Sequence, residues 1–142
     1  MNLKDQLKRD EGLRLHAYPD PLTNAEPWTI GYGHTGGIKE GDTITEHEAS
    51  KILDSDISKF TTQVISHIPW TKQMDEVRFS VLVNMCFNMG INKLLTFVNT
   101  LKYIKAGDYE QAAINMLHSR WAEQVKGRAT RLAKQMETGE WQ

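Results

Sequence analysis

The amino-acid sequence predicts an α+β fold in which a small antiparallel β lobe is segregated from a larger helical lobe. Three observations lead to this expectation. Prolines, glycines and alternating apolar residues gather between residues 13 and 44, a long stretch with helical spacing follows, and all apolar spacing after Pro69 is helical. We expect the long helix to join the two lobes and a ligand to bind in the cleft between them.

The first element is a short helix over residues 3–11. Leu3 and Leu7 stand four residues apart, Asn2 can cap the helix start, and Gly12 is a natural residue just beyond the helix end. Glu11 is then the last residue of this helix.

The β lobe is expected over about residues 13–44. Apolar residues alternate there in two runs, which predicts strands of a twisted antiparallel sheet with irregular loops. The runs are Leu13, Leu15 and Ala17, and then Trp28, Ile30 and Tyr32.

The linking helix is expected over about residues 46–66. Thr45 and Glu48 form a capping box at its start, and apolar residues keep helical spacing until Pro69 ends the run. Such a helix is ~30 Å long, which is enough to bridge two lobes.

The C-terminal half is expected to be helical throughout. Glycines close three of its helices and Asp108 opens another, which places them over about residues 72–89, 93–105, 109–118 and 127–137. No repeat or linker interrupts the chain. We therefore expect a single domain over residues 1–142, in which the helix over 3–11 returns to a helical lobe of about 69–142.

The composition excludes several classes of protein. With 17 basic and 18 acidic residues the formal net charge is −1, so the whole molecule is not a polycation for nucleic acid. The single cysteine, Cys86, cannot form an intramolecular disulfide, and its apolar neighbours predict a buried side chain. The N-terminus is charged where a signal peptide needs an apolar core, and no segment approaches the ~18 apolar residues of a membrane span. We expect synthesis and folding in a reducing cytoplasm.

Two carboxyl groups near the N-terminus are candidates for acid and base chemistry. Glu11 ends a helix, where the negative end of the helix dipole favours a carboxyl that keeps its proton, as a general acid must. Asp20 lies between Pro19 and Pro21 in a loop, where it should be solvated and ionised. This is the pair that glycoside hydrolysis uses, although the spacing alone supports it weakly.

Other motifs point away from cofactors and metals. Residues 31–36 match the glycine pattern of a dinucleotide site, but the next helix starts only near residue 46, so a glycine-rich hairpin fits better. The five histidines form no pair at helical metal-ligand spacing, and we expect no cofactor and no metal. Residues 118–136 carry a formal charge of +4, which favours either an anionic polymer as ligand or a solvated helix face.

Taken in order along the chain, the residues resemble a known family. Asp10-Glu11-Gly12-Leu13-Arg14-Leu15, Tyr18-Pro19-Asp20 and Trp28-Thr29-Ile30-Gly31-Tyr32-Gly33-His34 resemble the N-terminal site of the phage-type lysozymes, the endolysins of glycoside hydrolase family 24. The resemblance continues through residues 84–90, 112–115, 119–121, 128–129 and 138–141. Within the family, the sequence is most similar in type to the short muramidases of T-even phages. It implies a lysozyme-like fold.

The resemblance implies hydrolysis of the β-1,4 bond between N-acetylmuramic acid and N-acetylglucosamine in bacterial peptidoglycan. Glu11 is similar to the family's general acid, Asp20 to the carboxylate that positions water, and Thr29 to the hydroxyl that helps hold that water. Inversion at the anomeric carbon would follow, with the two carboxyls ~6.5–9.5 Å apart. The loop between Asp20 and Thr29 is longer than in the familiar pattern.

The resemblance also implies supporting roles. Arg128 is similar to the arginine that sits against the acid, and His34 belongs to the same motif as a supporting residue. The implied substrate contacts are Gly33 and Thr35 in the β lobe and Phe87, Thr100 and Asn115 in the helical lobe.

The expected partners follow from the same resemblance. They are peptidoglycan as substrate and a holin that opens the membrane for export, with no nucleic acid and with a monomeric enzyme. The enzyme would wait in the host cytoplasm and then act on the wall in the periplasm during host cell lysis. Two alternatives stay open: a non-catalytic wall-binding module on the same fold, and a lytic transglycosylase whose products end in a 1,6-anhydro ring. Asp20 counts against the second, because attack by the sugar's own hydroxyl has less need of another carboxylate.

Overall fold

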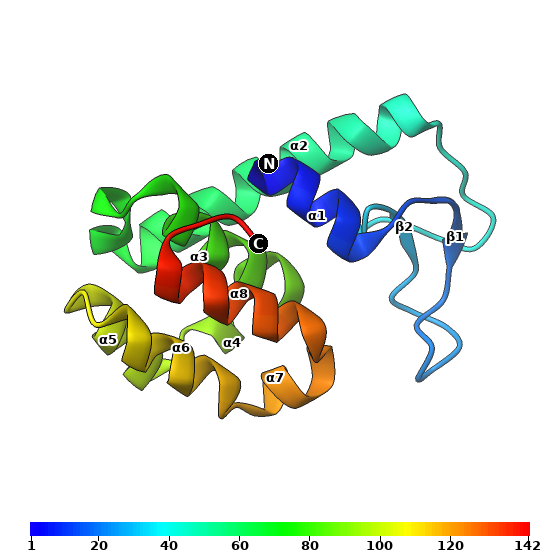
Figure 1. Cartoon of the computed structure of the whole chain (residues 1–142). Coiled ribbons are helices and arrows are strands. Elements are labelled where there is room, and N and C mark those ends of the chain that lie inside the picture. The colour runs from blue at the N-terminus through cyan, green and yellow to red at the C-terminus, as the bar shows by residue number, and fades with distance from the viewer. The chain divides into compact units, whose positions relative to one another are not determined.

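The computed structural model describes all residues from Met1 to Gln142, and the chain forms two compact units, residues 1–59 and 60–142 (Figure 1). Helices make up most of the second unit, and the first unit combines helices with the one sheet, which has two antiparallel strands. The predicted α+β class is confirmed. None of the helices is both long enough and apolar enough to cross a membrane.

The first unit consists of one short helix, the two strands and most of the long helix. The bounds are α1 Leu3–Glu11, β1 Arg14–Tyr18, β2 Thr29–Gly31 and α2 Glu46–His67, which continues into the second unit. The start of α1 is capped by Asn2, whose side chain accepts a hydrogen bond from the backbone N–H of Asp5, and Gly12 follows its end with a φ of 70°. The capping box of α2 is present too, because Thr45 and Glu48 exchange side-chain to backbone hydrogen bonds of 3.1 Å. These local signals explain why both helices begin where the sequence predicts.

The two strands form an antiparallel pair joined by a loop over residues 19–28. Tyr18 lies opposite Thr29 in this pair, and Arg14 lies opposite Gly31. Isolated bridges add to the β structure outside the strands, between His16 and Thr43 and between Ile30 and His34. The pairing brings the start of β2 back to the end of β1.

Apolar side chains from α1, β2 and α2 form the core of the first unit. Leu7, Ile30, Ala49 and Leu53 are buried almost completely. Gly31 has a φ of +65°, and a Cβ atom there would lie 3.3 Å from Ile44 Cδ1, so glycine suits the backbone of β2 at this point. Apolar residues of α1, β2 and α2 are therefore all buried in this unit.

The second unit is entirely helical. Its elements after α2 are the 3₁₀ helix η1 Pro69–Gln73, α3 Glu76–Met89, α4 Ile91–Leu94, α5 Val98–Lys105, α6 Tyr109–Leu117, α7 Arg120–Val125 and α8 Gly127–Thr138. α6 packs against both α5 and α8, and α3 packs against α8 (Figure 1). The large side chains buried between these helices are Leu82, Met85, Leu94, Met116, Leu132 and Met136. Cys86 is buried as predicted.

Two of the predicted helices in this unit need correction. α3 begins at Glu76 rather than near residue 72, because η1 precedes it and Asp75 caps it by accepting a hydrogen bond from the backbone N–H of Arg78. The helix expected over 93–105 is in fact two helices, α4 and α5. The Thr96 hydroxyl donates a hydrogen bond of 2.6 Å to the carbonyl of Lys93 at the end of α4. This local bond competes with continuation of the helix.

α7 is missing from the sequence prediction. It has six residues, too few to show a periodic apolar pattern. Its start is capped by Ser119, whose hydroxyl accepts a hydrogen bond from the backbone N–H of Ala122, and it is separated from α8 by Lys126, whose φ is +51°. The turn at Lys126 changes the chain direction before α8 begins.

Candidate active site

Glu11 is the last residue of α1, and the backbone of Gly33 lies directly beside its carboxyl group. A Cβ atom at residue 33 would come within 2.7 Å of Glu11 Oε2 and 3.0 Å of Glu11 Cδ. Gly33 also has a φ of +72°, which L-amino acids with side chains rarely adopt. Glycine at this position therefore serves two needs: it allows the turn, and it leaves room for the carboxyl.

The turn that carries Gly33 is held from two sides. Ile30 and His34 exchange two backbone hydrogen bonds of 2.9 Å across it. His34 Nδ1 lies 2.7 Å from Oδ2 of Asp56, a residue of α2 that is only 8% exposed. Because β2 and α2 both anchor the turn, the space beside Glu11 has a fixed shape. His34 thus supports this region of the first unit by holding the turn in place.

Asp20 and Thr29 lie at the base of one loop. Thr29 is the first residue of β2 and pairs with Tyr18, which precedes Asp20 by two residues. The backbone N–H of Asp20 donates a hydrogen bond of 3.0 Å to the carbonyl of Ala25, and the Asp20 carbonyl accepts one of 2.7 Å from Asn24. The loop therefore folds back on its own start, and its extra length forms a turn beyond Asp20.

The loop also orients the side chain of Asp20. Its Oδ1 atom accepts a hydrogen bond of 2.8 Å from the backbone N–H of Leu22, whereas Oδ2 has no partner within the protein. The side chain is half-buried. A carboxylate with one oxygen fixed and the other open can bind and orient a water molecule. Thr35, the other predicted residue of this unit, is exposed just after His34.

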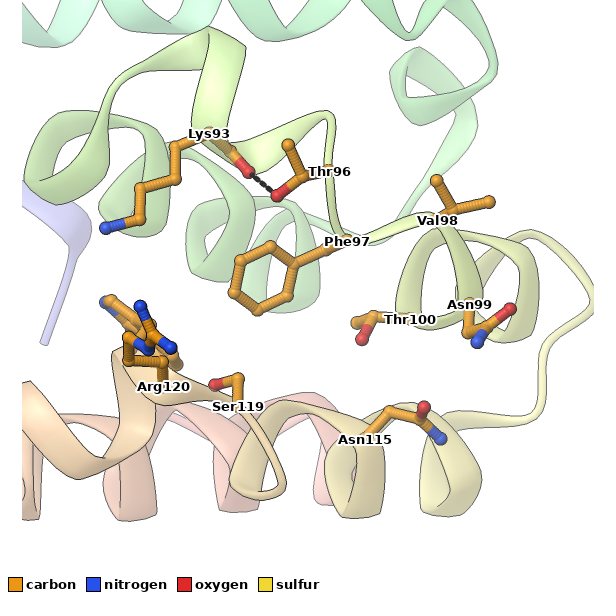
Figure 2. A pocket seen from close by; sticks show the side chains of 10 residues that line it. Lys93, Thr96, Phe97, Val98, Asn99, Thr100, Asn115, Ser119 and Arg120 are labelled. Carbon is orange, nitrogen blue, oxygen red and sulfur yellow. Dashed lines mark hydrogen bonds between the residues drawn. The ribbon is translucent and has the colours of Figure 1, made fainter.

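In the second unit, Thr100 and Asn115 line one pocket with a volume of about 320 Å³ (Figure 2). Thr100 comes from α5 and Asn115 from α6, so they face the pocket from two helices. Asn115 Nδ2 donates a hydrogen bond of 3.0 Å to the carbonyl of Gln111. This bond fixes the amide and leaves its oxygen for a ligand.

Other side chains of this pocket were not assigned from the sequence. The rings of Phe97 and Trp121 meet edge to face with centroids 6.2 Å apart, and Trp121 Nε1 donates a hydrogen bond of 2.7 Å to Asn88. Lys93 and Arg120 add two cations to the lining (Figure 2). Rings, an amide, hydroxyls and cations together suit a ligand that is polar and negatively charged on one side and apolar on another. Two sequence signals point to part of this set, because residues 119–121 lie both within the resemblance and within the basic segment 118–136.

Phe87 and Arg128 belong to the second unit but do not line this pocket. The Phe87 ring packs edge to face on Phe60, with centroids 5.4 Å apart. Arg128 Nε and Nη2 donate hydrogen bonds of 3.1 and 2.9 Å to Oδ1 of Asn84, which is fully buried on α3. These bonds set the direction of the Arg128 guanidinium group.

The first unit thus contributes a carboxyl at the end of a rigid helix and a carboxylate with an open oxygen, the two groups that glycoside hydrolysis requires. The model of the phage lysozyme family matches residues 8–137, which include every site residue described above. The chain belongs to the phage lysozyme family. It is a glycoside hydrolase of the lysozyme type that acts on peptidoglycan, and its α+β structure is the lysozyme-like fold.

This phage lysozyme is similar to proteins from several sources. It is 31% identical over 164 residues to probable T4-type lysozyme 1 of Dictyostelium discoideum, with 97% of this chain and 95% of the relative covered. It is 34% identical over 129 residues to the endolysin of Acyrthosiphon pisum secondary endosymbiont phage 1, with 89% and 82% covered. It is 32% identical over 164 residues to the pre-baseplate central spike protein Gp5 of Enterobacteria phage T4, where 98% of this chain corresponds to 28% of the relative. The matched region thus makes up nearly all of the first relative and about a quarter of the third.

Proposed function

We propose that this phage lysozyme hydrolyses the β-1,4 bond between N-acetylmuramic acid and N-acetylglucosamine with inversion at the anomeric carbon. Glu11 is the general acid, Asp20 is the carboxylate that positions the water, and Thr29 helps to hold that water. The observation that carries the proposal is the arrangement of these groups in a phage lysozyme: Glu11 fits against Gly33, and one oxygen of Asp20 is open.

The proposed reaction proceeds in one displacement. The Glu11 carboxyl gives its proton to the leaving glycosidic oxygen while positive charge develops on the sugar ring. A water molecule on the opposite face of the ring, held by Oδ2 of Asp20, attacks the anomeric carbon and loses its proton to that carboxylate. The hydrogen bond from Leu22 to Oδ1 supports this role, because it keeps the carboxylate from rotating. Inversion requires the two carboxyl groups to stand ~6.5–9.5 Å apart, so that the water fits between them and the sugar.

Each unit by itself has proposed substrate contacts. Gly33 and Thr35 contact the glycan from the first unit, and Phe87 contributes an apolar surface from the second. Thr100 and Asn115 provide a hydroxyl and an amide oxygen for the acetamido groups or the peptide of the substrate. We also propose that residues 1–142 act as a single domain, as the sequence predicts.

We propose host cell lysis as the biological role. The relative from Acyrthosiphon pisum secondary endosymbiont phage 1 is named an endolysin, and the match covers 82% of it. In this role the enzyme acts as a monomer, waits in the host cytoplasm until a holin opens the membrane, and then reaches the wall.

Digestion of purified peptidoglycan tests the reaction. Mass spectrometry of the products should show muropeptides with a reducing N-acetylmuramic acid end, and proton NMR during the first minutes should show the α anomer before it equilibrates. Products with a 1,6-anhydro ring would identify a lytic transglycosylase. Binding to the wall without release of reducing sugar would identify a non-catalytic module. Either result would overturn the proposed function.

A further inference from the structure

An apolar groove borders α5 in the second unit. It has a volume of about 370 Å³, and we call it the α5 groove; its lining residues are His67, Ile68, Trp70, Leu95, Val98, Leu101, Lys102 and Lys105. Val98 is 67% exposed, although it is a large apolar side chain on a helix. Trp70 and Lys105 also line an adjoining pocket of about 390 Å³. An exposed apolar side chain beside a groove is a candidate contact for a partner.

The groove lies in a part of the chain that is positively charged. Residues 60–74 and 91–107, which supply all of its lining, contain no aspartate, no glutamate and no arginine, and their cations are Lys72, Lys93, Lys102 and Lys105. The acids that follow these segments are Asp75 and Glu76 after the first and Asp108 and Glu110 after the second, and none of them lines the groove. In a chain with a net charge of −1, this is a local excess of positive charge around an apolar surface.

We propose that the α5 groove is a docking surface for an anionic phospholipid membrane. Tryptophan is enriched where a protein meets the boundary between lipid and water, which is the environment that Trp70 and the exposed Val98 would find there. Lysine side chains can lay their apolar stems along such a surface and place their charged ends among the phosphates. This goes beyond hydrolysis of the wall, because it concerns where the enzyme is held.

The chemistry of the groove favours a lipid surface over a soluble polyanion. Specific recognition of phosphate groups typically uses the paired N–H donors of arginine, and the groove has none. Lysine acts as a mobile point charge, which suits the diffuse potential of an anionic bilayer. The apolar lining would also contribute nothing to a polyanion that stays in water. Attraction of this kind is reversible and weakens as the salt concentration rises.

Vesicle binding by the full-length protein tests the proposal. We expect co-sedimentation with vesicles of one third phosphatidylglycerol in phosphatidylcholine, and none with pure phosphatidylcholine. The double variant Lys102→Gln/Lys105→Gln should bind about 25-fold more weakly, from about fivefold for each lysine near an anionic surface. Val98→Ser should bind about fivefold more weakly, because its apolar contact with the lipid is lost. Circular dichroism checks that each variant is folded.

The matched control is Lys126→Gln/Lys134→Gln, which removes the same charge from the other basic segment of the chain. It should bind vesicles like the wild type. Equal losses in both double variants would show that net charge alone attracts the protein, and would overturn the proposal. So would binding to soluble polyphosphate at least as strong as to vesicles, with Val98→Ser unaffected. Cleavage of purified, membrane-free peptidoglycan is measured in parallel, so that the docking surface and the proposed hydrolysis are tested separately.

Discussion

Adding one methyl group at Gly33 should disturb the carboxyl of Glu11 and thereby slow the reaction. In Gly33→Ala the new Cβ atom would lie 2.7 Å from Glu11 Oε2, whereas ordinary contacts begin at 3.4 Å, so the carboxyl must move by about 0.7 Å. A misplacement of about 1 Å in a catalytic group can cost ~10²-fold in rate, and we expect kcat to fall by about 10- to 100-fold. The positive φ adds a destabilisation of about 1–2 kcal/mol.

Gly37→Ala is the matched control for this experiment. Gly37 has the same φ of +72°, but no atom lies within 4 Å of the position that its Cβ would take. The two variants should lose similar stability in urea denaturation, while only Gly33→Ala should lose rate in the clearing of purified peptidoglycan. Equal rates for the two variants, after correction for the folded fraction, would refute the idea that Gly33 makes room for the Glu11 carboxyl.

Two further predictions concern other carboxylates of the first unit. Asp56→Ala removes a largely shielded hydrogen bond to His34 and should lower the free energy of unfolding in urea by about 1.5–3 kcal/mol. The control Asp54→Ala removes an exposed ion pair with Lys4 and should lower it by at most about 1 kcal/mol. Equal losses of stability in the two variants would show that His34 is not anchored through Asp56. Asp20→Asn should lower kcat on purified peptidoglycan by ~10²–10⁴-fold without changing stability by more than about 1 kcal/mol, and wild-type turnover in this variant would remove Asp20 from the mechanism.

Local signals predicted much of the first unit. The Asn2 cap, Gly12 and the capping box of Thr45 and Glu48 act within one helical turn, and the sequence alone therefore locates the ends of α1 and the start of α2. The break between α4 and α5 could not be predicted in this way. It depends on the hydroxyl of Thr96 bonding back to a carbonyl, and the apolar spacing continues across it unchanged.

The same difference between local and long-range signals applies to the residues of the candidate site. Glu11 and Asp20 are predicted from a helix end and a loop between prolines, and the resemblance implies the roles of both residues and of Thr29. The ring pair of Phe97 and Trp121 arises only when α5, α6 and α7 pack together, so no local pattern could place it. The open oxygen of Asp20 likewise depends on how the loop folds back on itself.

The proposed reaction requires a proton from Glu11, and the kcat of Glu11→Gln on purified peptidoglycan measures this requirement directly. The amide has nearly the same shape but cannot supply the proton. We expect kcat to fall by ~10²–10⁴-fold, while the variant still sediments with the wall like the wild type. Turnover close to that of the wild type in a folded Glu11→Gln variant would contradict the assignment of the general acid.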